Sequence, residues 1–130
     1  MYRWVDHTSE LELEIQAPSE EAVFAEAIAA LAELVGDGGG PPMAREVEVA
    51  ADDHALLLVE WLTELVYLSE LEELVPERIA SMELTEGRLR ATVEGHRARP
   101  RHLVKAVTLH RLELSGDDEA GWRARVVLDV

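Results

Sequence analysis

Hydrophobic and polar residues alternate strictly near the start of the chain, where residues 11–16 read LELEIQ. Side chains point to opposite faces along an extended strand, so the three aliphatic residues share one face. Glu12 and Glu14 share the other face. This pattern predicts a half-buried strand whose acids face solvent.

A helical pattern follows this strand directly. Ser19 is placed as an N-cap, and Glu20 and Glu21 put carboxylates in the first turn, where they oppose the helix dipole. Apolar residues recur at helical spacing over positions 23–35, and Gly36 is expected to end the helix as a C-cap. The segment GDGGGPP, residues 36–42, breaks both regular structures and is interpreted as a loop.

A second strand and a second helix come next. Residues 45–51 (REVEVAA) alternate again and predict a strand. Either Asp52 or Asp53 can cap the helix that begins at His54 and reads HALLLVEWLTELVYLSELEEL. Its broad apolar face indicates that it packs against a sheet.

The remainder of the chain predicts strands joined by turns. The expected strands are 78–84, 88–96, 104–114 and 122–130, with turns at 85–87 and 115–121. Alternation is imperfect within 104–114, and the last two strands are expected to form an antiparallel hairpin. Two helices and six or seven strands predict an α+β domain spanning residues 1–130, with both helices packed on a curved, mostly antiparallel sheet.

Charge restricts the classes of partner. The chain carries 27 acidic residues and 12 basic residues, a formal net charge of −15, which repels a phosphate backbone. We therefore expect no direct, stable binding to nucleic acid, and expect a basic protein surface or a cation as partner. The chain has no cysteine, no signal-like start and no apolar run of membrane-spanning length. These features predict a soluble cytoplasmic protein without a membrane partner.

The common catalytic motifs are missing, because the sequence contains no P-loop, no GxGxxG, no HExxH and no GxSxG. The five histidines are scattered and are interpreted as surface or capping residues. One basic segment, HRARPRHLVK at residues 96–105, stands out in an acidic chain. It either binds phosphate or a carboxylate-rich partner, or simply offsets the acids of the chain itself.

Acidic residues also gather at the two chain ends. Asp6, His7 and Glu10 lie near the start, and Asp129 is the penultimate residue. Carboxylate oxygens suit a hard cation such as calcium or magnesium. From pattern alone, solvated strand ends remain the alternative, because Glu10 shares its strand face with Glu12 and Glu14.

The sequence resembles the archease family, whose members assist the GTP-dependent RNA ligase of tRNA splicing. The resemblance is carried by four stretches in order along nearly the whole chain. They are Tyr2-Arg3-Trp4-Val5-Asp6-His7-Thr8-Ser9-Glu10, the leucine-rich residues 56–70, Val104-Lys105-Ala106-Val107-Thr108, and Leu128-Asp129-Val130.

The resemblance implies a divalent cation, commonly calcium, with magnesium or manganese as alternatives. It implies Glu10, Asp129 and Val130 as ligands, and Asp6, His7 and Lys105 as partner-binding residues. The family has Ala-Asp where this chain has Ser9-Glu10, and the added methylene moves the carboxylate outward. Because the implied ligands come from both ends of the chain, we expect these ends to converge on one cation.

The resemblance also implies a function without catalysis of its own. The expected role is an accessory factor that promotes guanylylation and repeated turnover of the ligase. Two alternatives stay open: a general chaperone or protein-interaction module, and a metal-dependent hydrolase that uses the acidic cluster.

Overall fold

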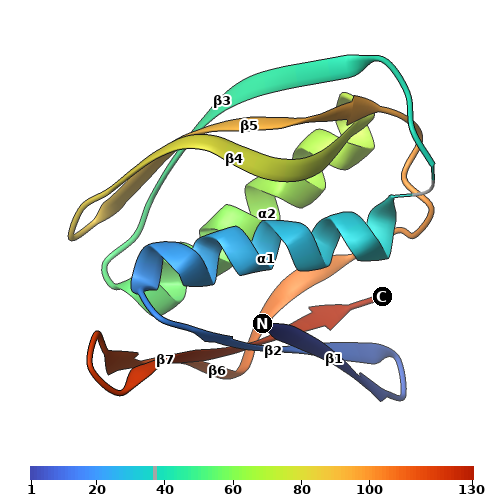
Figure 1. The fold of residues 1–130 in the computed structure, drawn as a ribbon. Coiled ribbons are helices and arrows are strands. Elements are labelled where there is room, and N and C mark those ends of the chain that lie inside the picture. Colours follow the sequence, from blue (N-terminus) through green and yellow to red (C-terminus); the bar gives the residue numbers. More distant parts are fainter. Residues whose placement is uncertain (37) are drawn as a thin grey trace.

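A computed structural model describes residues 1–36 and 38–130, and it has a layered α+β architecture (Figure 1). Two helices lie between two antiparallel sheets, one of four strands and one of three. The predicted α+β class with two helices is confirmed. The division of the strands into two sheets, one on each side of the helices, was not anticipated from the sequence.

The four-stranded sheet carries both ends of the chain. Its strands are β1 (Tyr2–His7), β2 (Glu10–Ala17), β7 (Gly121–Asp129) and β6 (Ala106–Asp117), in the order β1-β2-β7-β6. Every neighbouring pair is antiparallel, including the predicted β6–β7 hairpin. Strand β1 had not been predicted as an element of its own.

The three-stranded sheet is built from β3 (Pro42–Ala50), β5 (Arg88–Arg97) and β4 (Leu74–Leu84), in the order β3-β5-β4. Strand β4 begins four residues before the predicted start at Arg78 and runs through Pro76. Proline is tolerated there because β4 is an edge strand, and the register with β5 shifts between Pro76 and Arg78.

The helices begin where their capping residues predict. Helix α1 spans Glu20–Val35 behind Ser19, whose hydroxyl accepts a hydrogen bond from the Ala22 amide. Helix α2 spans His54–Leu71 behind Asp53, which caps it in preference to Asp52. Within the predicted loop 36–42, Asp37 lies outside the described residues. Gly36 follows α1 with extended backbone angles, so it ends the helix without the left-handed turn common at C-caps.

The core lies where the helices meet the inner faces of both sheets. Its largest fully buried side chains are Trp61, Phe24, Leu13, Ile15, Ile28, Leu31, Leu57, Leu58, Leu62, Leu65, Leu74 and Leu89. Trp61 of α2 donates its indole N–H to the Phe24 carbonyl of α1 at 3.2 Å, which satisfies the one polar atom of this buried ring. In the part of the chain that the structure describes, no helix combines the length and the apolar character needed to cross a membrane.

His54 connects the starts of the two helices. Its Nδ1 lies 2.6 Å from a Glu20 carboxylate oxygen, and its Nε2 lies 2.9 Å from the Thr85 carbonyl oxygen. Burial alone lowers the pKa of His54, but the hydrogen bonds to Glu20 and Thr85 and the charge of Glu20 outweigh it. The net effect raises the pKa of His54 above its ordinary value.

This raised pKa predicts a pH-dependent contribution to stability. The contribution is fully present below the unfolded-state pKa of about 6.5 and is lost as the pH rises through the folded-state pKa. His54→Gln should lower the free energy of unfolding by about 1 kcal/mol at pH 6 and by less at pH 9, measured by urea denaturation. His102→Gln, at an exposed position, serves as the control. An equal loss at both pH values would contradict the assignment.

Gly95 of β5 predicts a second effect on stability. A Cβ at this position would lie 1.8 Å from the Val75 carbonyl oxygen, which is backbone and cannot rotate away. Gly95→Ala should therefore cost about 3 kcal/mol of unfolding free energy in chemical denaturation. Gly39→Ala, where a Cβ would meet nothing within 4 Å, should change it by less than about 0.5 kcal/mol. Equal effects of the two substitutions would refute this account.

Candidate functional site

The end of strand β7 is held between the β1–β2 turn and the segment that leads into β6. The Val130 amide donates to the Ser9 carbonyl at 3.3 Å, and Ser9 has a left-handed backbone with a φ of 64°. On the other side, the Lys105 amide donates to the Asp129 carbonyl at 2.8 Å. Backbone hydrogen bonds thus join three of the four stretches of the family resemblance, because residues 2–10 and 104–108 both bond to residues 128–130.

Strand register places Glu10 directly opposite Asp129. The two residues are partners in the β2–β7 ladder, while His7 pairs with Glu10 on the other side, in β1. Residues opposite each other on neighbouring strands project from the same face of a sheet. Glu10 and Asp129 are far apart in the sequence, and the pairing of β7 with β2 brings them side by side.

A half-open hollow of about 450 Å³ adjoins these residues, and we call it the chain-end hollow. It is lined by Trp4, Asp6, His7, Glu10, Leu11, Glu33, Leu34, Arg101, His102 and Val130. Asp6, His7, Glu10 and Val130 are residues predicted for the site. Asp129 and Lys105, also predicted, are not among the lining residues.

Tyr2 fixes one wall of the chain-end hollow. Its hydroxyl donates to a Glu33 carboxylate oxygen at 2.6 Å, which ties β1 to the last turns of α1. Burial, together with this hydrogen bond and the negative charge of Glu33, raises the pKa of Tyr2 to about 12. Tyr2 is therefore a neutral donor at physiological pH.

The predicted basic segment closes the end of α1. Arg101 donates from its backbone amide to the Val35 carbonyl at 2.7 Å and from its guanidinium to the Glu33 carbonyl at 2.7 Å. These carbonyls lie at the C-terminal end of the helix, where positive charge is favoured. Arg101 thus has a structural role within the chain. Lys105, in contrast, has an exposed side chain.

One histidine departs from the surface interpretation. His96 is only 7% exposed, and its Nδ1 lies 2.9 Å from a Glu77 carboxylate oxygen. Because Glu77 occupies the irregularity in β4 beside Gly95, its carboxylate can reach inward to this ring. The interpretation of His96 as a surface residue was therefore wrong.

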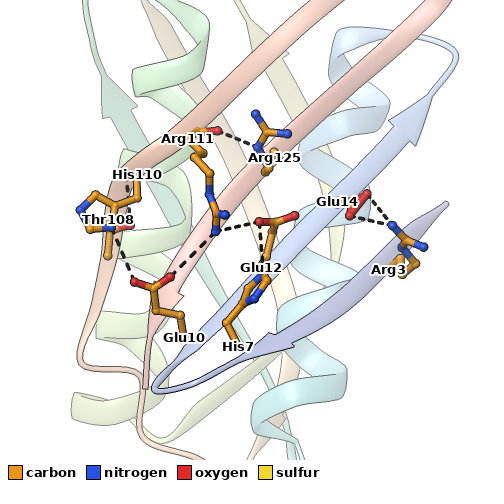
Figure 2. A network of polar contacts seen from close by, with 9 residues as sticks. All are labelled: Arg3, His7, Glu10, Glu12, Glu14, Thr108, His110, Arg111 and Arg125. Carbon is orange, nitrogen blue, oxygen red and sulfur yellow. Dashed lines mark hydrogen bonds and ion pairs between the residues drawn. The ribbon is translucent and has the colours of Figure 1, made fainter.

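The outer face of the four-stranded sheet holds a polar network that the sequence did not reveal (Figure 2). Glu12, predicted to face solvent, is only 8% exposed. Its carboxylate lies 2.9 Å from Arg111 Nη2 and 3.6 Å from His7 Nε2. A buried carboxylate requires such partners, so Arg111 compensates the charge of Glu12.

A bulge in β6 brings Arg111 to this position. The register with β7 runs to Thr108 and resumes at Glu113, so residues 109–112 oppose a single residue of β7. Arg111 has a left-handed backbone with a φ of 51°, and its carbonyl accepts a hydrogen bond from Arg125 Nε at 2.9 Å. The imperfect alternation within 104–114 was the one sequence signal of this bulge.

Glu10 also turns toward the bulge. Its carboxylate oxygens lie 3.6 Å from His110 Nδ1 and 3.9 Å from Arg111 Nη2 (Figure 2).

Within residues 1–36 and 38–130, no group of three or more histidine, aspartate or glutamate side chains is already arranged to hold a metal ion. Glu10 and Asp129 nevertheless face each other across the β2–β7 ladder, and two carboxylates in such a pair suit a hard cation. Glu10, Asp129 and Val130 as ligands stay a prediction.

Sequence comparison matches residues 2–130 to the model of the Archease protein family (MTH1598/TM1083). "Protein archease" of Methanosarcina acetivorans is 32% identical over 140 aligned residues, covering 99% of this chain and 95% of that protein. "Protein archease" of Pyrobaculum calidifontis is likewise 32% identical over 140 residues, with the same coverage.

Solved structures agree with these sequence matches. The solution structure of Methanobacterium thermoautotrophicum protein 1598 aligns with a TM-score of 0.76 and 26% identity, covering 99% of this chain and 98% of that one. The crystal structure of an archease from Thermotoga maritima, described as a possible chaperone, aligns with a TM-score of 0.72. At 22% identity over 100% of this chain and 98% of that one, this second likeness supports the fold alone.

Proposed function

The chain belongs to the archease family, and from this membership we propose that it is a non-catalytic accessory factor of the GTP-dependent RNA ligase of tRNA splicing. In this role it docks transiently on the ligase and promotes its guanylylation and repeated turnover. The observation that carries the proposal is the chain-end hollow, where Asp6, His7 and Glu10 of the opening motif meet Val130 of the terminal motif.

The charge of the chain supports docking to a basic protein. A net charge of −15 complements the positively charged surface with which a ligase holds RNA, and such complementarity raises association rates and orients the partner. Lys105 lies next to Asp129 in space and is exposed. In this position it offers a point charge to a phosphate or to a ligase carboxylate.

A divalent cation is part of the proposal. Glu10 and Asp129, with main-chain oxygen at Val130, would hold it, and calcium, magnesium and manganese all accept such ligands. When bound, the ion would neutralise the opposed carboxylates, and a coordination position not filled by the protein would accept an oxygen of an anionic group on the partner. Asp6 and His7, which line the same hollow, would contact the partner directly.

The first test counts RNA molecules joined per ligase in the presence of GTP and a catalytic amount of this protein. The parent protein should raise this count at least about tenfold above a single turnover, and Asp6→Asn should reduce the gain. Glu60→Gln, an exposed charge change on α2, should retain it. A count that stays at one or a few turnovers with the parent protein would contradict the proposed role.

The second test measures the cation through the melting temperature. Calcium at ten times its dissociation constant should raise the melting temperature by about 4 °C, because a ligand of the folded state stabilises by mass action. Asp129→Ala and a short tag after Val130 should abolish the shift, whereas a tag before Met1 and Glu60→Gln should preserve it. If calcium, magnesium and manganese all leave the melting curve of the parent unchanged, the cation site is wrong.

A general interaction module is the second candidate, and one surface feature favours it. Leu103 and Leu109 are 64% and 61% exposed, in a stretch from Gly95 to Leu112 that contains no acidic residue. Exposed apolar side chains of this kind can hold unfolded clients. This candidate requires suppression of aggregation of unrelated proteins, with no dependence on Asp129 or Lys105.

A further inference from the structure

Glu10 stands between two hollows of the surface. One is the chain-end hollow, where it joins Asp6 and Val130. The other, of about 380 Å³, is lined by His7, Glu10, His110 and Arg111, and we call it the bulge hollow. Glu10, like His7, borders both hollows, and we expect a change of Glu10 rotamer to move its carboxylate from one to the other.

In this structure the carboxylate of Glu10 points to the bulge hollow. It lies 3.6 Å from His110 Nδ1 and 3.9 Å from Arg111 Nη2, and both groups come from the irregular part of β6 (Figure 2). These contacts are longer than hydrogen bonds. The guanidinium of Arg111 attracts Glu10 by charge alone at this distance, so a divalent cation can displace it.

The position of Arg111 does not depend on Glu10. Its guanidinium lies 2.9 Å from the buried carboxylate of Glu12, and its carbonyl is held by Arg125 at 2.9 Å. The guanidinium therefore stays on Glu12 when Glu10 leaves. A fixed positive charge thus stands beside the carboxylate that is predicted to bind the divalent cation.

We propose that Arg111 is a positioning residue that holds Glu10 on the bulge side and competes with the divalent cation for its carboxylate. This inference rests on the cation site proposed above. Two effects act in one direction: the guanidinium attracts Glu10 away from the chain-end hollow, and its charge repels an incoming cation. Arg111 thereby lowers the affinity of the site and limits its occupancy at low cation concentration.

The length of the side chain at position 10 belongs to this mechanism. A glutamate extends one methylene further from the strand than an aspartate, which helps its carboxylate to reach across to β6. Glu10→Asp should therefore shorten the reach toward Arg111 and weaken the coupling between the two residues. The family resemblance has aspartate at this position. The longer glutamate of this chain is, in this view, what allows Arg111 to hold the carboxylate.

The experiment measures calcium affinity by titration calorimetry in the parent and in single-charge variants. Arg111→Gln should bind calcium about fivefold more tightly than the parent, the size expected of a partly exposed ion pair. Arg3→Gln is the matched control, because Arg3 also pairs with a glutamate of β2, Glu14 at 2.7 Å, on the same sheet. This control should change the affinity by less than about twofold.

A double-mutant cycle separates competition for Glu10 from a general effect of charge. In a Glu10→Asp background, Arg111→Gln should tighten calcium binding by less than about twofold, because the coupling has been weakened. If Arg111→Gln destabilises the fold by leaving Glu12 unpaired, the combined Glu12→Gln, Arg111→Gln variant removes both charges of the buried pair. This variant should still bind calcium more tightly than Glu12→Gln alone.

Each outcome decides the proposal. Unchanged or weaker binding by Arg111→Gln overturns it, as does an undiminished effect of Arg111→Gln in the Glu10→Asp background. If the parent binds calcium through Asp129 but Arg111→Gln binds equally well, only this inference fails and the cation site stands. If neither the parent nor Arg111→Gln binds calcium, magnesium or manganese, both fail together.

Discussion

A single layer of two helices supplies the apolar surface on which both sheets depend. Helix α1 packs on β4 of one sheet and on β1, β2 and β7 of the other, while α2 packs on β3, β4 and β5 and also on β6. Each helix must therefore be apolar around much of its circumference, and neither sheet can bury its inner face without this layer. The requirement explains why long aliphatic runs occur in both helices of so acidic a chain.

The same requirement sends the charged groups to the outer faces and ends of the sheets. Glu10, Asp129 and Val130 lie at one end of the four-stranded sheet, where β7 finishes beside the start of β2. Glu12 lies on the outer face but is buried there, so its carboxylate needs the positive charge of Arg111 close by. The bulge of β6 and the left-handed backbone of Arg111 meet this need, and both are local departures from regular structure in a region bordering the site.

Local chemistry allowed much of the fold to be predicted from the sequence. Ser19 and the pair Asp52 and Asp53 indicated the helix starts, because capping depends only on residues close in the chain. Strand β1 was missed, since Val5 and Asp6 break its alternation, and the division into two sheets depends on long-range packing that no local pattern encodes. At the site, the resemblance named Glu10 and Asp129, but the pairing of Glu12 with Arg111 joins residues far apart in sequence. That pairing also depends on the bulge of β6, whose extent the broken alternation did not specify.

The position of β7 has a consequence for the order in which the protein can be made. β7 comes last among the strands in the chain, yet it lies in the interior of its sheet, between β2 and β6. During synthesis, the β1–β2 hairpin is therefore made long before β7, the strand that joins it to β6. The three-stranded sheet and both helices are complete in sequence by Arg97, so they can assemble first, with one side of the helical layer still uncovered. Closure of that side waits for residues 121–129, and until then the nascent chain presents an apolar helical surface that cellular chaperones can bind.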